Sequence, residues 1–333
     1  MAALDHDDLW LPVHDASAAG GVRRAAVGIG DAAGLPAATL GDLAIVAMEI
    51  GTNLARHAVE GGVLVRASRK DEAVGVELIA VDRGPGMADA DEWARDGNST
   101  AGTLGIGLGA IARKSRSLDI YSLPRLGTVL AATVGDVPLQ TTAGISRPLS
   151  GERVCGDSYG TRTVDGREQV MLCDGLGHGP LAGVAAQAAV TGFATARPDG
   201  PAGVLSHLNE RLRSTRGAVA AVAEIDRDAG TVRFAGVGNV AATIVDGHRR
   251  RAMASLPGIL GQLAGETGRR SLREFDYPLP DGALVILHSD GLTERWDLAE
   301  YPGLAARAAI TVAATLLRDA GRRRDDASIL VAT

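Results

Sequence analysis

Four acidic residues stand at the edges of apolar, strand-like stretches in the second half of the chain: Asp157, Asp174, Asp290 and Asp325. Asp174 is followed by a glycine-rich turn that begins with Gly175, and glycines let backbone carbonyls and water approach a metal ion closely. Each motif alone is equally compatible with a solvated aspartate in a turn. Four together can hold two divalent ions, which generate a hydroxide nucleophile and bind a phosphoryl group.

A second group of polar residues lies in the first half of the chain. Glu49, Asn53 and His57 are spaced four apart, so they share one face of a predicted helix. A carboxylate and an amide on that face can take up a proton and a magnesium-bound phosphate. A plain solvated polar stripe would show the same spacing.

Two glycine-containing motifs follow the predicted helix. Asp82 comes directly after the strand-like stretch Val76–Val81 and precedes Gly84 and Gly86. A buried carboxylate there would accept a hydrogen bond from an adenine amino group, with the glycines admitting the base, whereas a tight turn is the alternative.

Further along, alternating glycines at Gly105, Gly107 and Gly109 lead into a predicted helix, where exposed N–H groups and the helix dipole favour an anion. This loop lacks the Gly-Lys-Ser/Thr of a Walker motif and opens no βαβ unit.

The elements that must position these residues fall into two predicted domains, which 333 residues can accommodate. Residues 1–136 are predicted to be an α+β sandwich, with helices on one face of a mixed sheet. Residues 137–147 lose periodicity and are predicted to be a linker. Residues 148–333 alternate strand and helix patterns, which indicates a second α+β domain.

The composition, with 46% hydrophobic and 22% charged residues, is that of an ordinary soluble globular protein. The net charge of −6 argues against a nucleic-acid partner. No apolar run approaches ~20 residues, so no membrane span is expected. The acidic N-terminus does not read as a signal peptide, and Cys155 and Cys173 lie in apolar sequence, so free thiols in a reducing cytoplasm are expected.

In the first half, the order Glu-x3-Asn, Asp-x-Gly-x-Gly and Gly-x-Gly-x-Gly resembles the N, G1 and G2 boxes of the GHKL (Bergerat-type) ATPases. Within that superfamily the sequence of the first half resembles the anti-sigma-factor and RsbT-type serine/threonine kinases. The resemblance implies that Glu49 is the base for a protein hydroxyl and that Asn53 binds Mg²⁺ beside ATP. The other ATP contacts that it implies are Asp82, Gly84, Gly86, Gly105, Gly107, Gly109 and Thr128.

In the second half, the motifs GDSY, DGLGHG, SDGLTE and DDASILV occur in the order found in PPM-type metal-dependent phosphatases, specifically the SpoIIE/RsbX-like bacterial branch. The resemblance covers about residues 145–333 and implies an αββα sandwich with two Mn²⁺ or Mg²⁺ ions. The implied metal-site residues are Asp157, Asp174, Gly175, Asp290 and Asp325. His178 lies four residues after Asp174, where it could protonate the leaving alcohol or serve a structural role.

The combination predicts a bifunctional partner-switching regulator that phosphorylates and dephosphorylates a STAS-domain antagonist protein. A sigma factor or a stressosome-like assembly is expected only as an indirect partner, and neither nucleic acid nor membrane is expected. Two alternatives remain open. The protein could be a phosphatase whose N-terminal domain senses nucleotide or docks a partner, or a non-catalytic, anti-sigma-type sequestering module.

Overall fold

The computed structural model describes residues 8–88, 104–197, 199–265 and 272–333. These residues form two compact units. The first unit comprises the described part of Asp5–Gln140 together with Ala306–Arg318, and the second comprises Thr141–Ala305 with Asp319–Thr333. The chain passes from one unit to the other inside the predicted linker. The expectation of an α+β protein with two domains is confirmed.

The first unit is built on a five-stranded sheet in the order β1-β2-β3-β5-β4. Every neighbouring pair is antiparallel, so the expected mixed sheet is wrong. The physical reason is that β2–β3 and β4–β5 are hairpins, whose short turns permit only antiparallel pairing. The strands are β1 (Leu9–Val13), β2 (Gly61–Lys70), β3 (Ala73–Val81), β4 (Ser117–Leu123) and β5 (Gly127–Gly135).

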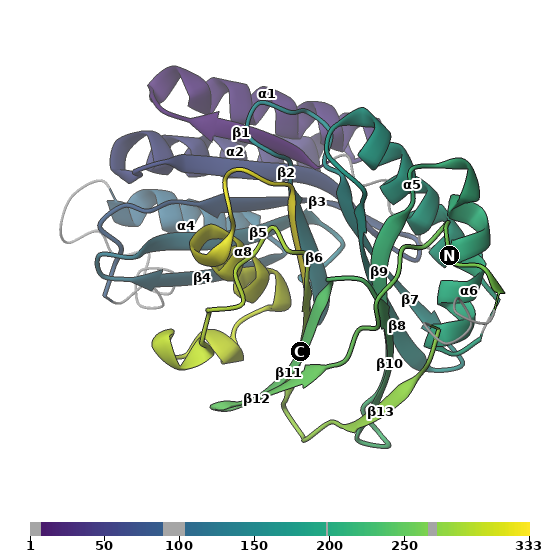
Figure 1. Cartoon of the computed structure of the whole chain (residues 1–333). Helices are drawn as coiled ribbons and strands as arrows, with labels where there is room; N and C mark the ends of the chain where they lie inside the picture. The colour runs from purple at the N-terminus through teal and green to yellow at the C-terminus, as the bar shows by residue number, and fades with distance from the viewer. Residues whose placement is uncertain (1–7, 89–103, 198, 266–271) are drawn as a thin grey trace. The chain divides into compact units, whose positions relative to one another are not determined.

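Three helices, α1 (Ala16–Ala32), α2 (Ala37–His57) and α4 (Leu104–Lys114), lie against one face of this sheet (Figure 1). Helix α1 begins at Asp15, whose side chain accepts hydrogen bonds from two N–H groups of the first turn, as an N-cap does. The core joins apolar residues of the helices, such as Ile50, to alternate residues of the strands, such as Val65.

The opposite face of the sheet is also buried at Leu64, Ile79 and Ala131, so apolar residues occupy both faces and not only the one expected. The segment Ala306–Arg318, which also belongs to this unit, contains most of helix α8 (Ala309–Ala320). Asp119 on β4 accepts a hydrogen bond of 2.8 Å from the N–H of Ala308, just before α8 begins. Toward the other end, the Arg318 guanidinium donates to the carbonyl oxygen of Asp82 at 3.2 Å.

The second unit contains two five-stranded sheets, in the orders β13-β10-β9-β8-β7 and β12-β11-β14-β15-β6. Residues from both sheets, including Tyr159, Phe234, Val285 and Leu330, share one hydrophobic core. The first sheet consists of β7 (Asp157–Val164), β8 (Arg167–Gly175), β9 (Ala218–Asp226), β10 (Thr231–Val237) and β13 (Phe275–Pro278). The second consists of β6 (Thr142–Arg147), β11 (Ala241–Asp246), β12 (Arg249–Met253), β14 (Leu284–His288) and β15 (Ala327–Ala332).

Helices α5 (Pro180–Thr195) and α6 (Pro201–Arg211) cover the outer face of the first of these sheets, where Phe193 and Leu208 join a second hydrophobic core (Figure 1). Each helix has proline at its start, where the missing N–H costs nothing. Short 3₁₀ turns occur at Leu212–Ser214, Leu298–Glu300 and Leu304–Ala306.

Strand β6 corrects the predicted linker of residues 137–147. Its residues Thr142–Arg147 pair with β15 along the edge of the second sheet, and Ile145 is completely buried. The sequence predicts a linker here because the residues are small and apolar residues do not clearly alternate with polar ones. Small residues are nevertheless required in an edge strand that packs over Tyr159. A Cβ on Gly144 would approach the Tyr159 ring to 2.5 Å.

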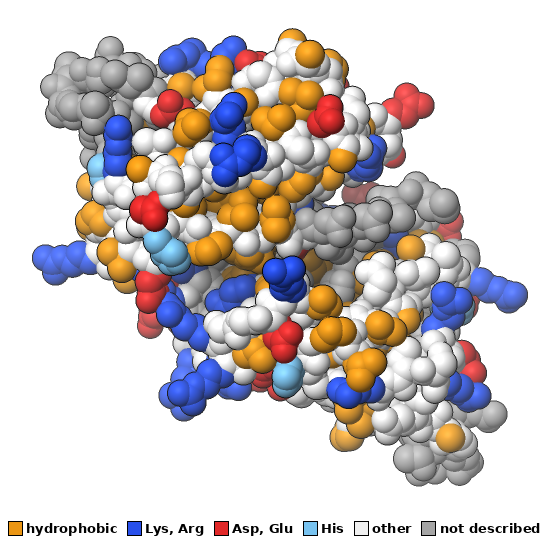
Figure 2. Space-filling model, turned by 90° about the horizontal axis from the view of Figure 1, so that it is seen from above, with side chains coloured by type: hydrophobic (Ala, Val, Ile, Leu, Met, Phe, Trp, Pro, Cys, Tyr) orange, Lys and Arg blue, Asp and Glu red, His pale blue; other side chains and the backbone are white. Residues whose placement is uncertain are grey.

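Within the described residues, no helix is long and apolar enough to cross a membrane. On the face shown in Figure 2, Lys and Arg side chains are interspersed with Asp and Glu side chains.

Candidate nucleotide and metal sites

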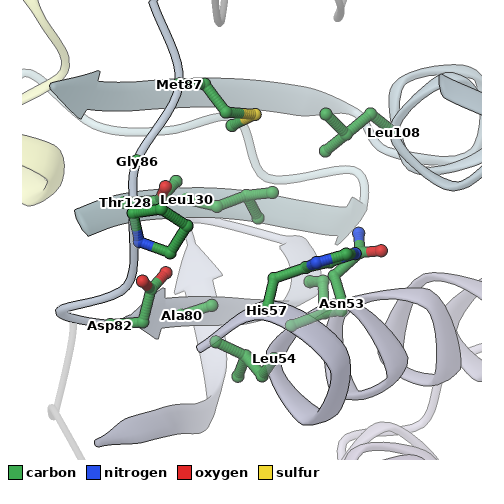
Figure 3. Close-up of a pocket in the computed structure, with 12 residues that line it drawn as sticks. Asn53, Leu54, His57, Ala80, Asp82, Gly86, Met87, Leu108, Thr128 and Leu130 are labelled. Atoms are coloured by element: carbon green, nitrogen blue, oxygen red, sulfur yellow. The ribbon is translucent and has the colours of Figure 1, made fainter. Parts of the chain in front are cut away.

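The first unit contains a cavity of about 150 Å³ between α2, β3, β5 and the loop that follows β3 (Figure 3). Four of its lining residues carry polar side chains: Asn53, His57, Asp82 and Thr128. The remaining walls are formed by Ile50, Leu54, Ala80, Pro85, Gly86, Met87, Leu108 and Leu130. A flat apolar slot with a few polar groups at its edges suits a heteroaromatic base.

Asp82 lies at the bottom of this loop with one carboxylate oxygen already engaged. Its Oδ1 accepts a hydrogen bond of 2.6 Å from the N–H of Gly84, and its own N–H donates to the carbonyl of Thr128. Burial raises the pKa of the Asp82 carboxyl, while the Gly84 hydrogen bond and the charge of Arg318 oppose that shift. A backbone hydrogen bond from Thr128 also opposes the shift, so the carboxyl lies among backbone donors on the wall of the cavity.

Glu49 and Asn53 converge on the start of α4. A Cβ built on Gly107 would lie 2.8 Å from Oε2 of Glu49 and 3.4 Å from Oδ1 of Asn53, so only glycine lets the helix come this close. The predicted helical face is thus realised, with Glu49 just outside the cavity and Asn53 on its wall.

The predicted glycine loop differs from its expected conformation. Gly105, Gly107 and Gly109 all lie within α4 rather than in a loop before it. The segment before Leu104, which includes Gly102, is outside the described residues.

Thr128 borders the cavity from β5, and its hydroxyl is 2.9 Å from the Ser122 hydroxyl. Ser122 also accepts from the N–H of Met87 at 2.8 Å, which ties the loop after β3 to β4. Motif reasoning missed Ser122 because only strand pairing brings it to the cavity, and missed Met87 and Leu108 because an apolar side chain gives no motif signal.

In the second unit, the predicted carboxylates come from the ends of both sheets. Asp157 and Asp174 face each other in the β7–β8 register. Asp290 follows β14 closely and Asp325 precedes β15, and these strands are also neighbours. The N–H of Gly175 donates to the carbonyl of Gly156 at 2.9 Å, which continues the β7–β8 pairing one residue beyond Asp157 and Asp174.

The charges of these aspartates act on one another. Burial, together with the nearby charges of Asp290 and Asp325, raises the pKa of Asp174 to about 7. Burial and the charge of Asp174 raise the pKa of Asp157 well above its usual range, while a hydrogen bond from Ser289 opposes this. The four carboxylates therefore share one electrostatic environment that favours protons or cations.

The residues fit a divalent metal by their chemistry, although the described residues contain no group of three His, Cys, Asp or Glu side chains already spaced to hold an ion. Oδ2 of Asp157 is buried and has no hydrogen-bond partner among the described residues, as expected for an oxygen that awaits a cation. Carboxylates of this kind are the ligands that Mg²⁺ and Mn²⁺ prefer.

The neighbouring Asp326 has a different environment. Its Oδ1 accepts from the N–H of Leu149 at 2.7 Å and its Oδ2 from the N–H of Gly156 at 2.9 Å. Both oxygens are thereby committed to the backbone, which leaves Asp325 as the candidate ligand of this pair. His178 is exposed and lies 3.4 Å from Glu152 through Nδ1.

Comparison with known proteins identifies both halves. Residues 12–134 match the histidine kinase-like ATPase domain, and residues 164–333 match the family described as Stage II sporulation protein E (SpoIIE). The phosphoserine phosphatase RsbX of Bacillus subtilis (strain 168) is 27% identical over 142 residues, which is 43% of this chain and 69% of RsbX.

The serine/threonine-protein kinase RsbT of the same organism is 31% identical over 84 residues, covering 25% of this chain and 63% of RsbT. The chain thus spans less than two thirds of RsbT. A solved structure described as "The bacterial stressosome: a modular system that has been adapted to control secondary messenger signaling" is 31% identical, with a TM-score of 0.51. The match covers 58% of this chain and 98% of the chain in that structure.

These matches agree with the geometry of the two sites. The chain joins a kinase-like GHKL ATPase domain to a PPM-type, metal-dependent protein serine phosphatase domain. Because the match over residues 164–333 spans half of the sequence, the chain belongs to the SpoIIE family.

Proposed function

We propose that this protein is a bifunctional partner-switching regulator, which adds phosphate to and removes phosphate from Ser or Thr of a STAS-domain antagonist protein. The observation that carries the proposal is that each unit assembles its own set of reactive residues, Glu49 and Asn53 in one and the four aspartates in the other. The similarity of separate segments to a kinase and to a phosphatase supports the pairing.

In the kinase reaction, the apolar cavity takes the adenine ring and the Asp82 carboxylate accepts a hydrogen bond from its amino group. Asn53, on the wall nearest α4, orients the Mg²⁺-bound phosphates of ATP. Glu49 lies beyond Asn53, at the mouth, where it takes the proton from the attacking hydroxyl of the substrate. A sensor domain that only binds nucleotide has no use for such a base.

In the phosphatase reaction, Asp157 and Asp174 would hold cations from one sheet, and Asp290 and Asp325 would hold them from the other. Two Mn²⁺ or Mg²⁺ ions bound there would lower the pKa of water and neutralise the phosphate charge. The carboxylates would fix where the cations lie, and metal-activated water would be placed for in-line attack on phosphorus, with the serine oxygen leaving. No covalent phosphoenzyme is needed.

The test is to incubate the full-length protein with STAS-domain proteins encoded in the same genome and to measure phosphate on the substrate. ATP with Mg²⁺ should add phosphate, and Mn²⁺ without ATP should remove it. Glu49→Gln should bind ATP normally and lose transfer by about 100-fold or more. Asp174→Asn should lose only the removal. Wild-type transfer by Glu49→Gln, or wild-type removal by Asp174→Asn with saturating Mn²⁺, would refute the corresponding half.

A second candidate function is a phosphatase whose ATPase domain senses nucleotide. It is supported by Arg318, which donates to the backbone of the adenine-reading Asp82 and lies a short loop before Asp325 in the chain. The Glu49→Gln variant separates the two functions, because a sensor responds to ATP without this base. A purely sequestering module is disfavoured by the intact carboxylates. A sigma factor or a stressosome-like assembly would be reached only through the STAS protein.

A further inference from the structure

Asn239 lies beside the metal site but belongs to none of the motifs that predicted it. It sits in the turn between β10 and β11, and its side-chain Nδ2 donates a hydrogen bond of 2.8 Å to Oδ2 of Asp290. The pairing of β11 with β14 explains the contact. Ala241 faces His288, and continuing this antiparallel register two residues outward brings Asn239 opposite Asp290.

The backbone holds this turn in one place. Gly238 has a φ of +93°, which disfavours other residues, and a Cβ at this position would lie 2.1 Å from Cγ1 of Val219. The N–H of Gly238 donates to the carbonyl of Leu256 at 2.9 Å, and Val237 forms a parallel bridge with Leu256. The position of Asn239 is therefore fixed by its neighbours rather than by the hydrogen bond alone.

The amide suits this position for an electrostatic reason. Asp290 shares its surroundings with Asp174 and Asp325, so another carboxylate opposite it would add to the repulsion. An amide donates a hydrogen bond without adding charge. With Oδ2 engaged by Asn239, the other oxygen of Asp290 is left to face a cation.

We propose that Asn239 is a positioning residue, which holds one oxygen of Asp290 so that the other is presented to a divalent metal ion. The inference rests on the proposed phosphatase function, because it concerns a ligand of that same site. Partners that orient metal ligands typically contribute ten- to hundredfold in metal affinity.

The experiment titrates the metal-free, full-length protein with Mn²⁺ in a calorimeter and measures phosphoserine hydrolysis as a function of Mn²⁺ concentration. Asn239→Ala should weaken Mn²⁺ binding about ten- to hundredfold. The Mn²⁺ concentration for half-maximal activity should rise by the same factor, while turnover at saturating Mn²⁺ should stay within a few-fold of wild type. Asn239→Gln, which keeps the amide, should recover part of the affinity.

His248→Ala, in the exposed turn at the far end of β11, is the matched control and should leave Mn²⁺ affinity unchanged. Thermal unfolding without metal verifies that each variant is folded. Unchanged Mn²⁺ affinity in a folded Asn239→Ala, beside an active wild type, overturns this inference alone. A turnover loss that saturating Mn²⁺ does not restore also overturns it, because it would mean direct contact with the substrate. A wild-type protein that neither binds Mn²⁺ nor hydrolyses phosphoserine refutes the proposed function as well.

Discussion

Asp325 and Asp326 are adjacent and chemically identical, yet the structure gives them different partners. Both oxygens of Asp326 accept backbone N–H groups, and this side chain is only 3% exposed. Asp325 accepts the N–H of Asp326 through Oδ1 at 3.0 Å, and its charge raises the pKa of both Asp174 and Asp290. The sequence motif cannot tell the two apart, because the distinction lies in which backbone groups they meet after folding.

This difference predicts opposite consequences for two neighbouring substitutions. Asp326→Ala leaves two N–H groups without acceptors, at about 1–3 kcal/mol for each buried group, so the unfolding temperature should fall even without metal. Asp325→Ala should leave that temperature nearly unchanged and weaken Mn²⁺ binding. Calorimetric melting and Mn²⁺ titration of both variants provide the measurement. An equal loss of thermal stability in both would contradict the assignment of roles.

Asp82 is a second residue at which function and stability compete. Burial raises its pKa above the unfolded value, so the ionised carboxylate disfavours the folded state at neutral pH, and this penalty fades as the pH falls through the folded pKa toward the unfolded pKa. Asp82→Asn keeps an oxygen for the N–H of Gly84 but removes the charge. We expect a higher unfolding temperature for the nucleotide-free protein and weaker ATP binding.

Scanning calorimetry and ATP titration at neutral pH measure both effects. Asp71→Asn, in the exposed turn between β2 and β3, is the control, since its carboxylate is distant from the cavity. A destabilised Asp82→Asn variant would contradict this expectation. It would show that the favourable interactions of the Asp82 charge outweigh the free-energy cost of burying it.

At the scale of elements, the loop after β3 depends on one glycine. Gly86 has a φ of +67°, and a Cβ there would lie 2.0 Å from the carbonyl oxygen of Leu123 in β4. Gly34 has a similar φ of +86° but open space around it. Alanine at either position should lower the free energy of unfolding by about 1–2 kcal/mol, because its Cβ disfavours the left-handed backbone conformation.

Only Gly86→Ala should also push the loop away from β4 and enlarge the cavity. We therefore expect Gly86→Ala to lose both thermal stability and ATP affinity, whereas Gly34→Ala should lose a similar or smaller part of the stability and none of the affinity. Melting curves and ATP titrations of the two variants decide the point. Equal ATP affinity in both would mean that the loop position is not set by this contact.

The elements around the chemistry were the most predictable part of the chain. Asp174 and Asp290 are predictable at strand ends because an apolar run followed by Asp-Gly is a local signal. The helical face of Glu49 and Asn53 follows from a spacing of four. Strand β6 was missed because its partner, β15, lies at the opposite end of this unit's sequence. Asn239 was missed for the same physical reason, since only the β11–β14 register brings it to Asp290.

At the scale of the whole molecule, Arg318 predicts communication between the nucleotide and metal sites. Its guanidinium holds the carbonyl of Asp82, and its own carbonyl accepts a hydrogen bond from the Arg83 guanidinium. The chain then continues through a short loop to Asp325. The proposed metal-site residue Asp325 therefore lies in the segment that follows the residue bound to Asp82, and we expect bound nucleotide to act on it. ATP should change the phosphatase rate of the full-length protein, and Mn²⁺ should change ATP affinity by the same free energy.

Arg318→Ala should reduce this coupling while both activities persist. Arg213→Ala, which removes an exposed pair with Glu210, is the control and should keep the coupling. Phosphatase rates with and without ATP, together with ATP titrations with and without Mn²⁺, measure it in all three proteins. An ATP effect of the same size in Arg318→Ala would show that the signal takes another route.

The pairing of β15 between β14 and β6 also sets an order of events during synthesis. Strand β6 leaves the ribosome early in the second unit, but the strand that binds it is made after all the other described strands. Until then the inner edge of β6 and one edge of β14 have no partner, and unpaired edges invite association with other chains. The second sheet therefore stays incomplete until β15 has been synthesised. Its closing contacts join residues that are far apart in sequence, and such contacts form slowly. The same delay postpones the phosphatase site, because Asp325 arrives just before the strand that closes the sheet.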